Sequence, residues 1–270
     1  MKTLTELSTD KSTFSIGRAF SDGWALVSKH LGYYILGGIV SVVISIVAGI
    51  IPFVGNLASQ LILSPCLMAG AIYVTWRISK GIGWTDLGDM FKGFKFLSPI
   101  IISATIQFAV MVTLAVLFLL NYLNLIIKFF EVAQGPGVLN NQEEIRELFR
   151  QILTPESVML FLFLMFFILL ISIIWVFKIH FIVIYKMQAW PAMEMSRKIA
   201  TRNLFPLIGY FLLMGIIIII SAIPCGIGLL FSLPLMIGSS YSAFAQITHC
   251  DEPDEINEEM FDFLANNKTE

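Results

Sequence analysis

Two stretches of the chain, residues 31–76 and 203–248, each run for 46 residues without a charged side chain. Each is about twice as long as the ~20 apolar residues that a helix needs to cross a bilayer. A cluster of proline and glycine interrupts each stretch near its middle, at residues 51–56 and 223–228. Because such clusters break helices, each stretch is predicted to form two helices joined by a short turn.

Two further apolar stretches, 96–127 and 157–177, are each long enough for one crossing. None of the four stretches alternates between apolar and polar positions, as the strands of a membrane barrel do. We therefore expect an all-α polytopic membrane protein with six transmembrane helices. The predicted helices are 33–51, 57–77, 97–121, 156–182, 205–222 and 228–248.

Amphipathic segments precede the first, third and fifth predicted spans. The apolar positions that share a helical face are Ile16, Phe20, Trp24, Val27 and Leu31 in the first, Trp84, Leu87, Phe91 and Phe94 in the second, and Ala192, Met195 and Ile199 in the third. In the second segment the opposite side is predicted to carry Asp86, Asp89, Lys92 and Lys95. A helix with an apolar face and a basic rim lies in the headgroup plane of a membrane. The same faces also fit packing against the helix bundle, and both interpretations stay open.

The sequence contains internal repeats. The pattern L-M-x-G-x-x-Y occurs at 67–73 and again at 235–241, and a basic residue stands two places before a leucine at 29–31, 95–97 and 202–204. These matches predict an internal hairpin repeat with three units, 15–77, 84–186 and 189–248. All three belong to one membrane domain, 15–250, which includes an outer loop at 128–155. A polar segment, 1–14, precedes this domain and an acidic tail, 251–270, follows it.

Composition supports the membrane assignment, because 57% of the residues are hydrophobic and 13% are charged. An average soluble domain is about 45–50% apolar and about 25% charged. This balance excludes an ordinary soluble globule and a nucleic-acid-binding domain. The net charge of −2 combines a tail of −7 over residues 251–270 with a remainder of +5.

Lysine and arginine predict the orientation, because loops on the cytoplasmic side carry an excess of both. In the six-helix topology thirteen of these residues lie on the side of the two chain ends, three lie on the other side, and Lys178 lies within a helix. Both termini are therefore predicted to be cytoplasmic. The expected location is the inner (plasma) membrane.

Two sets of polar residues are candidates for function. Lys29, Lys95 and Arg202 stand at equivalent places before a spanning pair, where they would meet anionic lipid headgroups. Gln107, Lys178 and His180 are polar residues inside predicted spans. Lys178 is expected to extend toward the headgroups, as long basic side chains near helix ends do, and Gln107 to hydrogen-bond a neighbouring helix.

The sequence contains no metalloprotease H-E-x-x-H, no phosphate-binding Walker loop, no nucleophile elbow and no pair of carboxylates within the spans. His249 and Cys250 offer too few ligands for a zinc site. We therefore expect no catalytic, cofactor or metal site, and the protein is predicted not to be an enzyme.

The segment 226–234, G-I-G-L-L-F-S-L-P, precedes Tyr241 and follows an amphipathic helix and a hairpin that turns on proline and glycine. With these features the chain resembles a broad group of uncharacterised bacterial six-helix membrane proteins. That group includes the membrane domain fused to some glycerophosphoryl diester phosphodiesterases. The resemblance covers most of residues 15–248, implies an inner-membrane location with a link to lipids or the envelope, and supplies no catalytic residues.

Two hypotheses of function follow. In the first, the protein is non-catalytic and binds lipid or a partner protein at the cytoplasmic face. In the alternative, it is a small carrier or permease subunit with Gln107, Lys178 and His180 in a central polar site. The surroundings of Lys178 and His180 distinguish them, because a carrier needs these side chains in a wet cavity.

Overall fold

The computed structural model of the 270-residue chain describes residues 14–51, 54–84, 86–123, 127, 146, 150, 154–223 and 226–251. Within these residues the chain forms helices and turns and no β-strand. Five helical stretches are long and apolar enough to cross a membrane: Leu31–Gly49, Val54–Ser79, Leu87–Leu120, Pro155–Ile184 and Leu204–Ala222. The fold is therefore all-helical and of the kind expected for a multi-pass membrane protein. Most of the predicted segment 1–14, the loop 128–155 and the tail 251–270 lie outside the described residues.

The chain divides into two compact units: residues 1–104 with 173–270, and residues 105–172. This division crosses the predicted middle unit, 84–186, and the duplication itself stays a prediction. The second unit holds most of α6 (Leu97–Leu120) and of α9 (Pro155–Ile174). In it the rings of Phe118 and Phe161 pack edge to face, with their centroids 6.2 Å apart.

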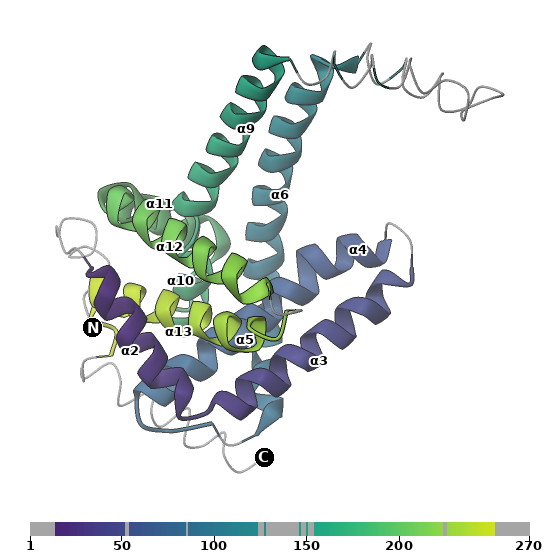
Figure 1. The fold of residues 1–270 in the computed structure, drawn as a ribbon. Helices are drawn as coiled ribbons and strands as arrows, with labels where there is room; N and C mark the ends of the chain where they lie inside the picture. The colour runs from purple at the N-terminus through teal and green to yellow at the C-terminus, as the bar shows by residue number, and fades with distance from the viewer. Residues whose placement is uncertain are drawn as a thin grey trace. The chain divides into compact units, whose positions relative to one another are not determined.

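Two helix pairs form much of the first unit (Figure 1). One joins α3 (Leu31–Gly49) to α4 (Val54–Ala58), the π-helix η1 (Ser59–Leu63) and α5 (Ser64–Ser79), and the other joins α12 (Leu204–Ala222) to α13 (Leu229–Thr248). The predicted breaks at 51–56 and 223–228 are therefore correct. The widened turn of η1 has a local cause, because Pro65 has no N–H to donate to the carbonyl of Leu61.

The sixth predicted span, 228–248, corresponds to α13, which is not among the five stretches that are long and apolar enough to cross a membrane by composition. At 20 residues α13 is long enough to cross a bilayer. Ser239, Ser240, Ser242 and Gln246 lower its apolar content, and the three serines are buried inside the first unit.

The fourth predicted span, 156–182, is not one helix. It is divided into α9 and α10 (Lys178–Ile184) by a turn at residues 175–177. The Ser196 hydroxyl donates to the Ile174 carbonyl at 2.8 Å and accepts from the Phe177 N–H at 3.1 Å. A side chain from another helix thus replaces the regular hydrogen bonds at this place, which is a recognised cause of helix breaks.

Three helices stand directly before α3, α6 and α12 in the sequence, and we call them the leading helices: α2 (Ile16–Ser28), η2 (Leu87–Phe96) and α11 (Ala189–Arg202). Each packs against a different helix: α2 along α13, η2 along α5 and α11 along α10. Figure 1 shows α2 beside α13, although these helices lie at opposite ends of the sequence.

The buried faces of two leading helices differ from the predicted ones. In α2 the predicted Val27 is buried, but the other buried residues are Ala19 and Gly23, and Trp24 is 39% exposed. The small residues admit the backbone of α13 more closely than an aromatic side chain would. The second leading helix, η2, is a 3₁₀-helix, so the α-helical spacing used for the prediction does not apply. It buries Asp89, Met90 and Gly93 and leaves Phe91 43% exposed. In α11 the predicted positions Ala192, Met195 and Ile199 are buried.

Candidate functional site

The three predicted basic candidates occupy corresponding places in the structure. Lys29 caps the C-terminal end of α2, Lys95 lies in the last turn of η2, and Arg202 lies in the last turn of α11. All three are exposed. A cation at the C-terminal end of a helix meets the partial negative charge of the free carbonyl groups, which favours these residue types at these positions whatever else they bind.

Each leading helix also exposes one large aromatic side chain. Trp24 of α2 is 39% exposed, Phe91 of η2 is 43% exposed and Trp190 of α11 is 69% exposed. No other large hydrophobic side chain within the described parts of these helices is exposed to this degree. Aromatic residues, tryptophan above all, are favoured at the boundary between lipid and water. Each leading helix therefore combines a face packed on the protein, an exposed aromatic ring and a basic end.

The contact between α5 and η2 is closed and contains a buried ion pair. Gly70 and Gly93 allow the two backbones to approach, since a Cβ at Gly70 would overlap the Met90 carbonyl. Arg77 Nη1 donates to Asp89 Oδ2 at 2.7 Å, and both side chains are less than 7% exposed. Lys92 Nζ lies 2.7 Å from the other oxygen of Asp89.

The contact between α2 and α13 is equally close at one point. Gly23 lies against the backbone of Gly238 and Ser239, where a Cβ on either glycine would overlap the other helix. Gln246 of α13 accepts a hydrogen bond from the backbone N–H of Ser15, the residue that precedes α2, at 3.0 Å. It thereby satisfies a backbone donor near the start of α2 that would otherwise lack a helical partner.

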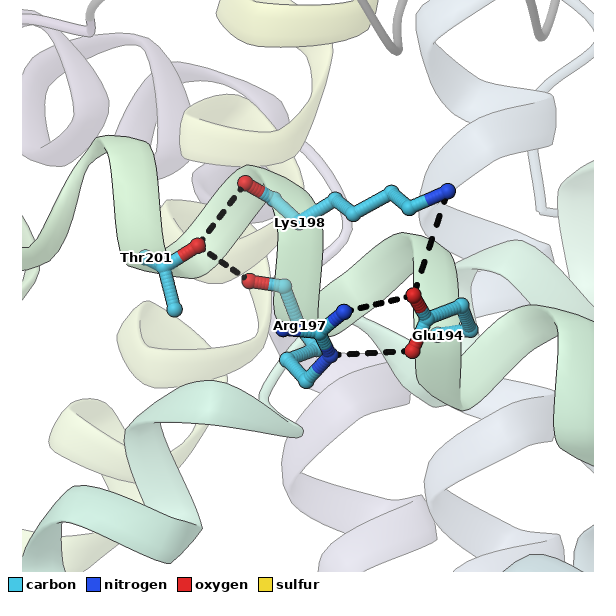
Figure 2. A network of polar contacts seen from close by, with 4 residues as sticks. All are labelled: Glu194, Arg197, Lys198 and Thr201. Atoms are coloured by element: carbon cyan, nitrogen blue, oxygen red, sulfur yellow. Dashed lines mark hydrogen bonds and ion pairs between the residues drawn. The ribbon is translucent and has the colours of Figure 1, made fainter.

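The face of α11 that is turned away from the protein carries an exposed polar network (Figure 2). Arg197 donates to both oxygens of Glu194, at 2.9 Å from Nε and 2.6 Å from Nη2, and Lys198 Nζ lies 3.8 Å from the same carboxylate. The hydrogen bonds from Arg197 lower the pKa of Glu194 below its ordinary value. Thr201 donates back to the carbonyl groups of Arg197 and Lys198.

Two of the predicted polar residues within the spans are buried and close together in sequence. Lys178 is 6% exposed and its Nζ donates to the Ser103 carbonyl at 3.1 Å, so it does not extend to the surface as expected. His180 is 1% exposed and stacks on Phe244 with ring centroids 5.0 Å apart. Gln107 belongs to the second unit. The structure therefore assembles no common site from these three residues within either unit.

Two large cavities lie in the first unit. One, of about 640 Å³, lies between α2 and the C-terminal half of α13 and is lined by charged and polar side chains together with Ala25, Leu26 and Ala245. We call it the polar cavity. The other, of about 650 Å³, lies between α3 and the helices α5 and α13 and is lined almost wholly by apolar side chains. Ser41 and Ser45 of α3 border the apolar cavity, but each donates its hydroxyl to the carbonyl four residues earlier. Neither cavity is lined by Lys178 or His180.

Cys250 follows α13 and is fully buried, with its Sγ 3.9 Å from the hydroxyl of Tyr241. Burial raises the pKa of this thiol to about 11, so it is protonated at neutral pH. A protonated thiol is neither a nucleophile nor a metal ligand. Among the residues that the structure describes, no three His, Cys, Asp or Glu side chains are grouped as metal ligands would be.

Three polar contacts between helices were not identified from the sequence: Arg77 with Asp89, Ser196 with the α9–α10 turn, and Gln246 with Ser15. For Asp89 the sequence held a signal, because an acidic side chain between the apolar residues Trp84 and Phe91 is costly to bury unless a basic side chain pairs with it. Serine and glutamine give no such signal, since both are common at exposed positions.

Comparison of the chain with models of known protein families, with curated proteins and with solved structures found no match. The resemblance to six-helix membrane domains therefore stays a prediction from the sequence.

Proposed function

We propose that the protein is a non-catalytic integral membrane protein of the inner membrane, and that its three leading helices bind anionic lipid headgroups at the cytoplasmic face. The observation that carries this proposal is the threefold combination of a packed face, an exposed aromatic ring and an exposed basic end. An amphipathic helix of this kind lies in the plane of the headgroups. A partner protein with an acidic surface would meet the same three basic ends.

The proposed topology has six spans and both termini in the cytoplasm, with α13 as the sixth. The serines of α13 are buried against other helices and would not contact lipid. An even number of crossings places both chain ends on one side, whereas five crossings place them on opposite sides. Protease added to right-side-out vesicles should therefore spare epitope tags at both ends, and cleavage of either tag alone would contradict six spans.

The lipid proposal is tested by replacing Lys29, Lys95 and Arg202 together with glutamine. Each basic group near an anionic surface contributes about 1 kcal/mol, so the triple variant should lose roughly a hundredfold in affinity for anionic lipid at low salt. The loss should shrink as salt rises, because exposed charges are screened within ~10 Å at 0.1 M. The measurement is the anionic phospholipid that co-purifies, by native mass spectrometry.

The matched control replaces Lys128, Arg146 and Arg150 with glutamine. These are the three basic residues on the proposed non-cytoplasmic side of the membrane. It removes the same charge and should leave retention of anionic lipid nearly unchanged where the outer leaflet carries none. Equal retention by the wild type and the first triple variant, after normal insertion of both, would leave these residues with a role in orientation alone.

The carrier alternative gains no support from the cavities. It requires Lys178 and His180 to face water, whereas both are buried and His180 packs among aromatic rings.

A further inference from the structure

The polar cavity between α2 and α13 has a floor whose polar groups are already paired. Tyr241 OH and Ser79 Oγ are hydrogen-bonded at 2.6 Å. Gln246 donates to Ser242 Oγ at 3.3 Å while it accepts from the Ser15 N–H. The floor is therefore held by its own hydrogen bonds, and recognition of a ligand falls to the side chains of the walls.

The walls carry charges of both signs. Besides the imidazole of His249 there are four charged groups: Arg18, Asp22 and Lys29 line the cavity from α2, and Asp251 lines it from the residues after α13. Within the described residues no ion pair joins any of these four, and Asp22 accepts only a hydroxyl hydrogen bond from Ser21 at 3.2 Å. Two basic and two acidic groups sum to zero, so a purely anionic ligand gains little net attraction here. A ligand with one group of each sign can pair with both.

We propose that the polar cavity binds the zwitterionic headgroup of a phospholipid, a phosphate and a primary ammonium group joined by a short linker. Arg18 and Asp22 are one helical turn apart, about 6 Å along the axis, which suits two opposite charges separated by a few bonds. Arginine matches phosphate with two parallel hydrogen bonds, and the Asp22 carboxylate accepts from the ammonium group. A volume of about 640 Å³ lies within the range of small-molecule sites.

A lipid is favoured over a soluble zwitterion by the surroundings of the cavity. Ala25, Leu26 and Ala245 give it an apolar part beside the charged groups, as an amphiphile requires. Trp24 is exposed on another side of α2, where an aromatic ring suits the lipid–water boundary. This inference rests on the proposed function, because it needs α2 to lie at the level of the headgroups.

The diagnostic variant is Asp22→Asn, with Glu194→Gln as the matched control on α11. Each protein is reconstituted in nanodiscs of equal phosphatidylethanolamine and phosphatidylglycerol, and retained lipid is measured by native mass spectrometry. Loss of one hydrogen bond to a charged group should lower retention of phosphatidylethanolamine about tenfold in D22N. Retention of phosphatidylglycerol should stay equal or rise, because an acid has been removed. E194Q should retain both lipids as the wild type does.

Three further results complete the test. Arg18→Gln should lower retention of phosphatidylethanolamine, whereas Lys198→Gln, on α11 and outside the cavity, should not. Equal retention of phosphatidylethanolamine by D22N and wild type overturns the headgroup proposal, even if the triple glutamine variant loses anionic lipid and so upholds the proposed function. Millimolar phosphoethanolamine is also added as a competitor. If it displaces the lipid, and if the protein in detergent binds the free compound as tightly as it binds the lipid, the cavity is a site for a soluble zwitterion and the lipid proposal is overturned.

Discussion

The α5–η2 contact and the α2–α13 contact have the same close backbone packing but differ in what their neighbouring charged residues do. Both depend on a glycine from the repeated pattern L-M-x-G-x-x-Y, Gly70 in one case and Gly238 in the other, and in both the backbones meet where a side chain would not fit. At the α5–η2 contact the neighbouring charges, Arg77 and Asp89, are buried and paired. At the α2–α13 contact the neighbouring charges surround an open cavity of about 640 Å³.

This difference separates a structural use of charge from a use in recognition. A buried pair contributes little net stability, but it imposes a strict requirement that both partners be present. Exposed charges of both signs around a cavity impose no such requirement on the fold and remain free to bind. The two contacts should therefore respond alike to changes at glycine and differently to changes of charge.

The largest expected effect comes from Gly70→Ala and Gly238→Ala. In each case the added methyl group overlaps backbone atoms of the neighbouring helix, which cannot rotate away as a side chain can. Overpacking of this kind costs about 3 kcal/mol or more at the severe end. Thermal unfolding in detergent should show both variants far below the wild type.

Gly215→Ala in α12 is the matched control, since a Cβ there has no neighbour within 4 Å. It should unfold at or slightly above the wild-type midpoint, because alanine favours a helix more than glycine does. A wild-type midpoint for G238A alone would contradict the likeness of the two contacts, because the α2–α13 contact would then not depend on glycine.

Removal of one member of the buried pair should have the next largest effect. Arg77→Met removes the buried basic partner of the Asp89 carboxylate, which stays buried 2.7 Å from the partly exposed Lys92. Breaking a buried pair costs about 3–5 kcal/mol, while replacing both partners with apolar residues is often nearly neutral. The double variant R77M/D89L should therefore recover most of the loss in thermal midpoint.

The corresponding change at the α2–α13 contact, Asp22→Asn, should leave the midpoint nearly unchanged, because Asp22 is exposed. An equal loss of stability in R77M and D22N would remove the distinction between the two contacts.

The spans were predictable because their signals are local. The helices predicted at 33–51 and 205–222 are found at Leu31–Gly49 and Leu204–Ala222, since lack of charge and a proline–glycine cluster decide both ends. Which face of a helix is buried depends instead on its neighbours. In α2 the contact with α13 selects Ala19, Gly23 and Val27 over the more apolar side that carries Phe20 and Trp24.

The polar contacts were less predictable because their partners lie on other helices. The break between α9 and α10 depends on Ser196, which lies 22 residues after Ile174. No property of residues 175–177 alone indicates it. The candidate basic residues at helix ends were predictable from the repeated basic-x-Leu pattern. The polar cavity was not, because Arg18 and Asp251 are separated by nearly the whole chain and meet only when α2 packs on α13.

A smaller effect should follow from Gln246→Ala. The change removes the acceptor of the Ser15 N–H and the donor to Ser242 Oγ, and a lost hydrogen bond of this kind costs about 1 kcal/mol. Hydrogen exchange should accelerate at the first turn of α2 and stay unchanged in η2. Gln246→Glu keeps the acceptor for Ser15 and should lose less protection at that turn. Equal acceleration in both helices would mean that the two contacts open together.

The smallest effect is expected at Glu194, whose ion pair with Arg197 is as short as the Arg77–Asp89 pair, 2.6 Å against 2.7 Å, but is exposed to solvent (Figure 2). Arg197 lowers the pKa of Glu194 in the folded protein. The pair therefore contributes stability above the pKa of the unfolded chain, about 4.3 for a glutamate, and that contribution is lost as the pH falls through the lower, folded-state pKa. Because exposed pairs contribute little and are screened by salt, E194Q should lower the thermal midpoint at pH 7 by less than Q246A does. The difference from wild type should shrink in high salt and disappear at acid pH, where the wild-type carboxylate is also neutral. If E194Q instead lowered the thermal midpoint as much as R77M does, and independently of salt, the Glu194–Arg197 pair would have to be shielded from solvent. The contrast between buried and exposed ion pairs would then not hold for α11.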